Sequence, residues 1–106
     1  SGARAGLTAF LAGPAREVAQ HNVTINNILP GQFATDRLRT ATAKMAEMRG
    51  LSVEEMMKTR REAIPARRFG EAEEFGQLCA FLCSAQAGYI TGQNLLIDGG
   101  LFPGAF

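Results

Sequence analysis

The sequence predicts an α/β fold in which parallel strands are covered by helices. Two apolar runs, residues 23–29 and 95–97, end in Pro-Gly and in Asp-Gly-Gly, as strands that lead into turns do. The long stretch between them has helical patterning, and strands joined by a helical crossover pair in parallel with right-handed connections. Two such strands do not make a stable sheet, so we expect further strands upstream.

The first element is expected to be a helix over residues 2–20. Its apolar positions are Leu7, Phe10, Leu11, Ala15 and Val18. They recur at spacings of three and four, which is the helical period. Small residues line the opposite side, so a sheet can cover one face and another helix the other. This helix and the apolar tail at 101–106 predict a homo-oligomer, because small monomers rarely expose so much apolar surface.

The first strand is expected over residues 23–29, which are rich in β-branched residues. Asn26 and Asn27 are unusual in such a strand, because buried amides need hydrogen-bond partners. We interpret both side chains as partners for backbone groups of neighbouring loops. Direct contact with a substrate is the alternative.

Residues 36–63 are expected to form two helices in series that act as a semi-detached substrate lid. Thr35 or Asp36 can cap the first helix, Gly50 can end it, and residues 52–55 are a capping box for the second. The segment is polar, contains all four methionines and has a weak apolar stripe. Few apolar anchors are typical of a region that opens easily.

A strongly buried helix is expected after the acidic turn that begins at Glu71, where negative charge complements a helix amino terminus. Its apolar positions are Phe75, Leu78, Cys79, Phe81 and Leu82. Cys79 and Cys83 share one face and have no nearby His, so they predict buried, reduced thiols and no metal site. Residues 95–97 then form a strand that we expect to be buried on both faces.

The composition fits one ordinary globular domain or part of one. The chain has 106 residues, of which 46% are hydrophobic and 20% charged. Its net charge of +1 gives no excess for binding nucleic acid or an anionic membrane. No apolar run approaches the ~20 residues of a membrane span. We therefore expect a cytoplasmic protein without nucleic-acid or membrane partners, and one cut from a longer chain, since it begins at Ser1.

Four motifs follow one another along the chain: Asn-Asn-Ile-Leu-Pro-Gly-Gln-Phe-Ala-Thr at 26–35, Arg-Phe-Gly-Glu at 68–71, Tyr-Ile-Thr-Gly-Gln at 89–93 and Asp-Gly-Gly at 98–100. Together they resemble the carboxy-terminal part of short-chain dehydrogenases/reductases, particularly the 3-oxoacyl-(acyl carrier protein) reductase-like branch. The resemblance is weakest over the lid. It implies the carboxy-terminal portion of a Rossmann-like doubly wound parallel sheet with flanking helices, in which residues 1–106 are part of a single domain.

The resemblance implies that the turn after the first strand holds the nicotinamide end of a cofactor. Pro30 and Gly31 would shape the turn, and the backbone of Phe33 would meet the carboxamide. The hydroxyl of Thr35 would reach the carboxamide or the pyrophosphate. Short backbone contacts would hold one face of the ring rigidly toward the substrate. Without the resemblance, the same residues predict only a strand-ending turn and a helix cap at Thr35.

Catalysis in this family depends on a Tyr-x-x-x-Lys pair, in which the lysine lowers the pKa of the tyrosine. Aligning Ala5-Gly6-Leu7 with the family's helix places Arg4 at the lysine position and the tyrosine position one residue before Ser1. Arg4 keeps a charge that can hold ribose hydroxyls, but its geometry and fixed protonation differ from those of an ammonium group. Tyr89 has Gln93 four residues on, so we expect it to be structural.

The resemblance implies an oxidoreductase that transfers hydride between NAD or NADP and a small-molecule carbonyl or alcohol substrate, with a 3-oxoacyl thioester as a candidate. The 106 residues contain neither the catalytic tyrosine nor a glycine-rich phosphate loop. We therefore expect the chain to depend on a missing amino-terminal half and to be inactive alone. The alternative, favoured by Arg4, is a catalytically silent relative kept for binding or assembly.

Two further features have modest interpretations. A basic cluster, Arg60, Arg61, Arg67 and Arg68, predicts either a solvated helix end or attraction for a phosphopantetheine-bearing substrate. His21 is expected to be an exposed turn residue without a role. In related family members, the first helix pairs across a two-fold axis, which also implies a homo-oligomer.

Overall fold

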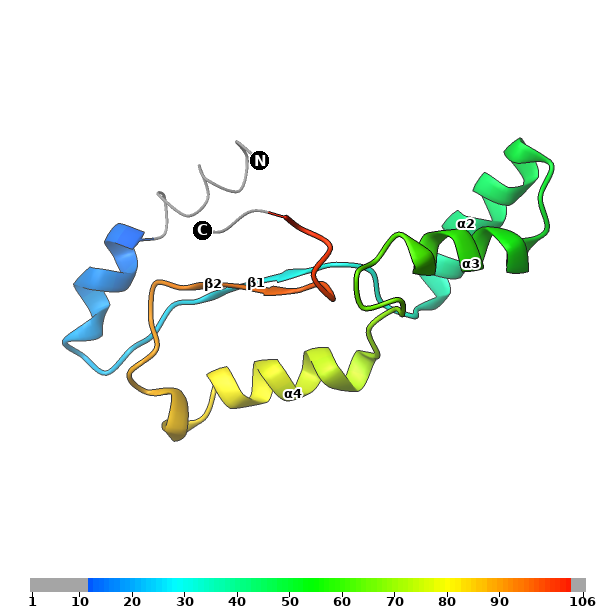
Figure 1. The fold of residues 1–106 in the computed structure, drawn as a ribbon. Coiled ribbons are helices and arrows are strands. Elements are labelled where there is room, and N and C mark those ends of the chain that lie inside the picture. Colours follow the sequence, from blue (N-terminus) through cyan, green and yellow to red (C-terminus); the bar gives the residue numbers. More distant parts are fainter. Residues whose placement is uncertain (1–11, 104–106) are drawn as a thin grey trace. The chain divides into compact units, whose positions relative to one another are not determined.

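A computed structural model describes residues 12–103 of the chain and has the predicted α/β character (Figure 1). Residues 12–19 are helical. The elements that follow are β1 (Asn27–Pro30), α2 (Asp36–Arg49), α3 (Val53–Glu62), α4 (Ala72–Leu82), a short 3₁₀ helix (Ala85–Ala87) and β2 (Asn94–Ile97). Among these helices, none is long and apolar enough to cross a membrane.

β1 and β2 pair as a two-stranded parallel sheet. The Asn27 N–H donates to Gln93 O at 2.8 Å, and four residues later the Gly31 N–H donates to Ile97 O at 3.0 Å. Both strands therefore advance in the same direction, as the crossover predicted. The predicted start of the first strand at residue 23 is wrong, because Ile25 bonds to the hydroxyl of Thr91 instead of a strand ladder.

The described residues form two compact units. The first contains residues 12–29 and 76–96, and the second contains residues 30–75 and 97–103. In the first unit, Ala15 and Ala87 are buried. The second unit has a larger apolar core of Met57, Ile64 and Phe69, against which three half-buried residues pack: Leu38, Val53 and Leu101.

The two asparagines of the first unit behave differently. Asn26 Nδ2 donates to Ile90 O at 3.0 Å, and its Oδ1 accepts from the Gln93 N–H at 3.1 Å, so the predicted role as a partner for loop backbone is confirmed. Asn27 Nδ2 donates to the side chain of Asn94 at 2.9 Å. The same prediction for Asn27 is therefore wrong, because the two amides face each other across the parallel strands.

The predicted burial of α4 and β2 is also wrong. No residue of α4 is buried, the side chain of Phe81 is 46% exposed, and all four residues of β2 are half-buried. Cys79 is half-buried and Cys83 is exposed, so the thiols are free, as predicted, but not part of a core. A helix or strand is buried only where other elements cover it, and the described residues provide just two strands.

The capping residues of the second unit act as the sequence predicted. Thr35 Oγ1 accepts from the Leu38 N–H at 3.2 Å and begins α2, which ends at Gly50 with a left-handed φ of 68°. Ser52 Oγ accepts from the Glu55 N–H at 3.1 Å at the start of α3. The two helices in series lie against each other as a hairpin (Figure 1).

Candidate functional site

The turn after β1 begins with a close approach between two backbone segments. A Cβ atom on Gly31 would lie 2.5 Å from Cβ and 2.7 Å from Cα of Asp98. Real Cβ atoms do not come this close to one another, so only glycine fits there. The Gly31 N–H donates to Ile97 O, and the turn is thereby held beside the end of β2.

Phe33 is held by a bridge to Gly70 and by its own carbonyl, which accepts from the Thr35 N–H at 2.8 Å. Gly70 forms a parallel bridge with it, in which the Ala34 N–H donates to Gly70 O at 2.8 Å and the Gly70 N–H donates to Gln32 O at 2.9 Å. In a bridge of this pattern, the N–H of the central residue points to the opposite side. The ring of Phe33 packs edge-on against Phe75, with 5.8 Å between centroids, and fixes the residue's orientation.

Thr35 ends the turn and begins α2. Its hydroxyl oxygen accepts from the Leu38 N–H, which leaves the hydroxyl proton available for donation. An open groove of about 350 Å³ runs along the turn, a volume within the range of small-molecule sites. It is lined by Pro30, Gly31, Gln32, Phe33, Thr35, Arg37, Leu38 and Ala41. The structure thus brings the four predicted cofactor residues of this turn to one groove.

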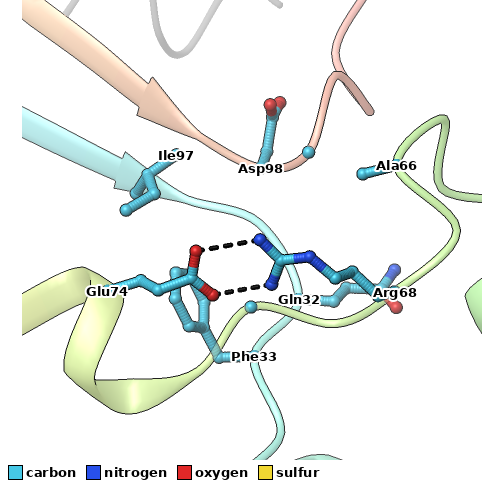
Figure 2. Close-up of a pocket in the computed structure, with 9 residues that line it drawn as sticks. Gln32, Phe33, Ala66, Arg68, Glu74, Ile97 and Asp98 are labelled. Carbon is cyan, nitrogen blue, oxygen red and sulfur yellow. Dashed lines mark hydrogen bonds and ion pairs between the residues drawn. The ribbon is translucent and has the colours of Figure 1, made fainter.

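A second, much smaller pocket shares Gln32 and Phe33 with the groove and is also lined by Arg68 and Glu74 (Figure 2). Arg68 donates to Glu74 through its two terminal nitrogens, from Nη1 to Oε1 at 2.6 Å and from Nη2 to Oε2 at 2.9 Å. These bonds and the Glu71 N–H lower the pKa of Glu74 from its ordinary 4.5 to about 2. The Glu74 interaction also raises the pKa of Arg68. The pair therefore fixes the loop before α4, which carries Gly70.

This small pocket has a volume of about 60 Å³, which holds roughly two water molecules and is too small for a cofactor. Gln32 Oε1 is buried at its edge without a hydrogen-bond partner among the described residues. A buried acceptor of this kind is normally satisfied by water. The small pocket therefore has room for water beside Gln32 but not for a cofactor, and the groove is the candidate binding site.

Known proteins resemble this chain over nearly its whole length. Residues 1–102 match the family described as Enoyl-(Acyl carrier protein) reductase. The chain belongs to the short-chain dehydrogenase/reductase family. It is 39% identical over 84 residues to NADPH-dependent reductase BacG of Bacillus subtilis, covering 79% of this chain and 32% of that protein. It is 37% identical over 99 residues to 3-oxoacyl-[acyl-carrier-protein] reductase FabG of Aquifex aeolicus, covering 93% of this chain and 36% of that protein.

Solved structures of the family share the fold. A short chain dehydrogenase family protein from Francisella tularensis superposes with a TM-score of 0.83 at 28% identity, over 92% of this chain and 40% of the other. The predicted fold class, the carboxy-terminal portion of a Rossmann-like sheet with flanking helices, is thereby confirmed. The chain spans about a third of the length of the curated relatives it matches.

Other residues that the sequence singled out for the family's chemistry are dispersed or lie outside the described part. Arg4 lies outside the described residues. His21 is in an exposed turn, as predicted. Tyr89 is fully exposed among the described residues, and its expected structural role stays a prediction.

The basic cluster does not act as one group. Arg68 pairs with Glu74, whereas Arg60 donates to the hydroxyl of Thr42 at 2.8 Å. Arg61 and Arg67 line an open hollow near the end of α3, and Arg67 donates to the carbonyl of Glu62. This arrangement fits a solvated helix end with cations near its carbonyl groups.

Sequence reasoning missed three contributors to the site region: Gln32, Glu74 and Asp98. Gln32 lies inside the Pro-Gly motif, where a polar residue next to an apolar strand was a usable signal. Asp98 stands in the Asp-Gly-Gly motif, but its contact with Gly31 joins positions far apart in the sequence. Such a contact has no local pattern.

Proposed function

We propose that this chain forms the nicotinamide-binding part of an oxidoreductase that transfers hydride between NAD or NADP and a carbonyl or alcohol substrate. The observation that supports this most is the turn from Pro30 to Thr35. On one groove it has the Phe33 backbone N–H, which lies outside the bridge to Gly70, and the Thr35 hydroxyl, whose oxygen accepts from the Leu38 N–H and whose proton can still be donated.

These groups suit a carboxamide. The Phe33 N–H can donate to its oxygen, and the Thr35 hydroxyl can bond its amide or a pyrophosphate oxygen near the amino terminus of α2. The nicotinamide, when bound, supplies the hydride. The chain's own part is orientation, because Gly31 is bonded to Ile97 and the backbone on both sides of Phe33 is bonded to Gly70.

The substrate proposal rests on the relatives. One is named as an NADPH-dependent reductase and one as a 3-oxoacyl-[acyl-carrier-protein] reductase, so a 3-oxoacyl thioester is our candidate. We propose residues 36–63 as the lid over this substrate, because α2 begins directly at the groove. A cytoplasmic location fits a substrate of this class.

The complete enzyme requires groups that these 106 residues do not contain. No glycine-rich loop opens a helix in this sequence, and its only tyrosine is Tyr89. We therefore propose that the chain works with an amino-terminal half and that the 106 residues alone neither bind the cofactor tightly nor reduce a ketone. Calorimetry with NADH and NADPH checks this, and micromolar binding by the isolated chain contradicts it.

The test of the proposed function uses the full-length protein with Thr35→Val and Thr35→Ser. Valine removes both the helix cap and the hydroxyl donor, whereas serine keeps them. We expect Thr35→Val to weaken NADH or NADPH binding roughly tenfold and Thr35→Ser to bind like the unmodified protein. Dissociation constants from cofactor fluorescence give the result. Equal binding by all three proteins removes Thr35 from the site, and no binding by the unmodified protein rejects the function.

A catalytically silent relative is the second candidate, because Arg4 occupies the position that matches the family's lysine. An arginine stays protonated and cannot relay protons as an ammonium group does. We expect Arg4→Lys in the full-length protein to raise or create reductase activity only if a tyrosine immediately precedes Ser1. Steady-state rates of both forms decide this, and a loss of activity on Arg4→Lys means that the guanidinium already serves the reaction.

A further inference from the structure

The turn that follows β2 contacts two segments that are distant in the sequence. On one side lies Gly31, whose Cα approaches Asp98 so closely that a Cβ would collide with it. On the other side lies the segment 64–66, which connects α3 to the loop before α4. We call residues 30–35 the cofactor turn, and residues 64–66, which directly follow the lid, the base of the lid. Asp98, Gly99 and Gly100 thus lie between the cofactor turn and the base of the lid.

The carboxylate of Asp98 holds this turn in shape. Oδ1 accepts from the Gly100 N–H at 3.0 Å, and Oδ2 accepts from the Phe102 N–H at 2.9 Å. Bonds from N–H groups to a charged oxygen are stronger than neutral ones. Both carboxylate oxygens therefore accept bonds from nearby backbone N–H groups. Figure 2 shows the carboxylate pointing away from Arg68 and Glu74. The side chain of Asp98 thus orients this backbone and takes no part in the Arg68–Glu74 ion pair.

The two glycines fit the turn against the base of the lid. Gly99 and Gly100 have left-handed φ angles of 64° and 88°, which favour glycine. A Cβ on Gly99 would lie 3.0 Å from Cγ2 of Ile64, and one on Gly100 would lie 3.3 Å from Cβ of Pro65. The Ala66 N–H also donates to Gly99 O at 3.0 Å.

We propose that Asp98 is a positioning residue for the cofactor turn and that the Asp98–Gly100 turn couples that turn to the base of the lid. The proposal rests on the function proposed above for residues 30–35. Displacing residues 64–66 moves Gly99 through direct contact and the Ala66 bond. Gly99 directly follows Asp98 in the chain, so a shift of Gly99 also moves Asp98. Because Asp98 is packed against Gly31 without free space, its movement displaces the cofactor turn.

The first test needs no substitution. Hydrogen exchange of the full-length protein is measured with and without NADH or NADPH, whichever binds, at the amides of Ala66, Gly100 and Phe102. Coupling predicts that the bound cofactor slows exchange at all three, although none of them lines the groove. Unchanged exchange at these amides, with cofactor bound, overturns the proposal.

The second test compares cofactor affinity in four variants of the full-length protein. Asp98→Asn can serve only one of the two N–H groups, and we expect its cofactor dissociation constant to rise roughly tenfold. Asp98→Glu keeps the charge and should restore part of the affinity. Gly99→Ala adds a Cβ against Ile64 and should also weaken binding.

The matched control for Gly99→Ala is Gly92→Ala, which lies outside both the groove and the proposed lid. Gly92 has the same left-handed conformation, with φ of 70°, but a Cβ there would meet only the Cβ of Ala15, at an ordinary 3.8 Å. It carries the backbone strain without a close contact, so we expect its cofactor affinity to stay within about twofold of the unmodified protein's. Equal weakening by both glycine variants, or folded Asp98 variants with unchanged affinity, overturns the coupling.

The outcomes separate this inference from the proposed function. If the unmodified protein binds neither NADH nor NADPH, both fail. If it binds one of them and Thr35→Val weakens the binding, but Asp98→Asn and Gly99→Ala do not, only the coupling fails. Weakening by all three variants, with Gly92→Ala unaffected, supports both.

Discussion

At the scale of single residues, the Arg68–Glu74 pair is the clearest fixed feature beside the turn. Its two parallel bonds match the planar guanidinium to the carboxylate (Figure 2). Both side chains are largely exposed, so solvent and salt screen the attraction and the pair adds little to overall stability. The ion pair instead acts by holding in place the loop before α4, in which Gly70 forms the bridge to Phe33.

The pH dependence of this pair is a direct test. The pKa of Glu74 falls from 4.5 to about 2 on folding, so the folded state binds the proton more weakly. The stabilisation is complete above about pH 4.5 and is lost as the pH falls toward about 2. We expect the thermal midpoint of Glu74→Gln to fall less over this range than that of the unmodified protein.

Glu73→Gln is the control for this pH series. Glu73 is exposed in the same first turn of α4, and no described residue forms a hydrogen bond or ion pair with its side chain. We expect its thermal midpoint to follow the unmodified protein at each pH. Identical pH profiles for Glu74→Gln and Glu73→Gln would show that the ion pair does not persist in solution.

At the scale of elements, a buried hydroxyl on α2 bonds to α3, in addition to the exposed Arg39–Glu54 ion pair between the two helices. Thr42 is completely buried on α2. Its hydroxyl donates to Leu38 O at 2.7 Å and accepts from Arg60 Nη1 of α3 at 2.8 Å. Buried polar groups are costly when a partner is lost, so this hydroxyl is the most sensitive position of the hairpin.

We expect Thr42→Val to lower the free energy of unfolding by about 1–3 kcal/mol, because it removes the oxygen acceptor of Arg60 Nη1 and leaves only the weaker bond to Met45 Sδ. Thr40→Val, on the exposed side of the same helix, repeats the chemical change without the contact and should fall within about 0.5 kcal/mol of the unmodified protein. Denaturant unfolding of the full-length proteins measures both. Equal effects would show that helix propensity and not the contact matters.

The lid itself is tested by hydrogen exchange. Its weak apolar stripe predicts that residues 36–63 exchange faster than residues 71–84. The hairpin nevertheless buries Thr42, Ala46, Met56 and Met57, so we expect α2 and α3 to open together as one unit. Protection equal to that of residues 71–84 would mean that the segment is core and not a lid.

At the scale of the whole molecule, the predicted homo-oligomer stays a prediction. The helix expected over residues 2–20 has two apolar faces, and Phe10 and Leu11 lie outside the described residues. We expect a homo-oligomer in which this helix pairs across a two-fold axis. Light scattering of the full-length protein and of Phe10→Glu and Leu11→Glu measures it. A monomer at high micromolar concentration contradicts the prediction.

The sequence by itself determined the order and type of the elements and the chemistry of the turn. Capping residues act on neighbours a few positions away, so Thr35, Gly50 and Ser52 were readable from local pattern. The Pro-Gly motif at 30–31 likewise predicted the end of a strand. Together with three other motifs, it predicted the family that the comparisons confirm.

Only the tertiary structure decided burial and long-range contacts. The apolar spacing of α4 predicted a helix but not its cover, and Asn27 met another side chain instead of backbone. Glycine at 31 was readable as part of a turn. The sequence could not show that Asp98 is the reason why only glycine fits there. The two residues are 67 positions apart, and their approach depends on how the strands pair. Local patterns specify conformation, whereas such an approach is fixed only when the chain is packed.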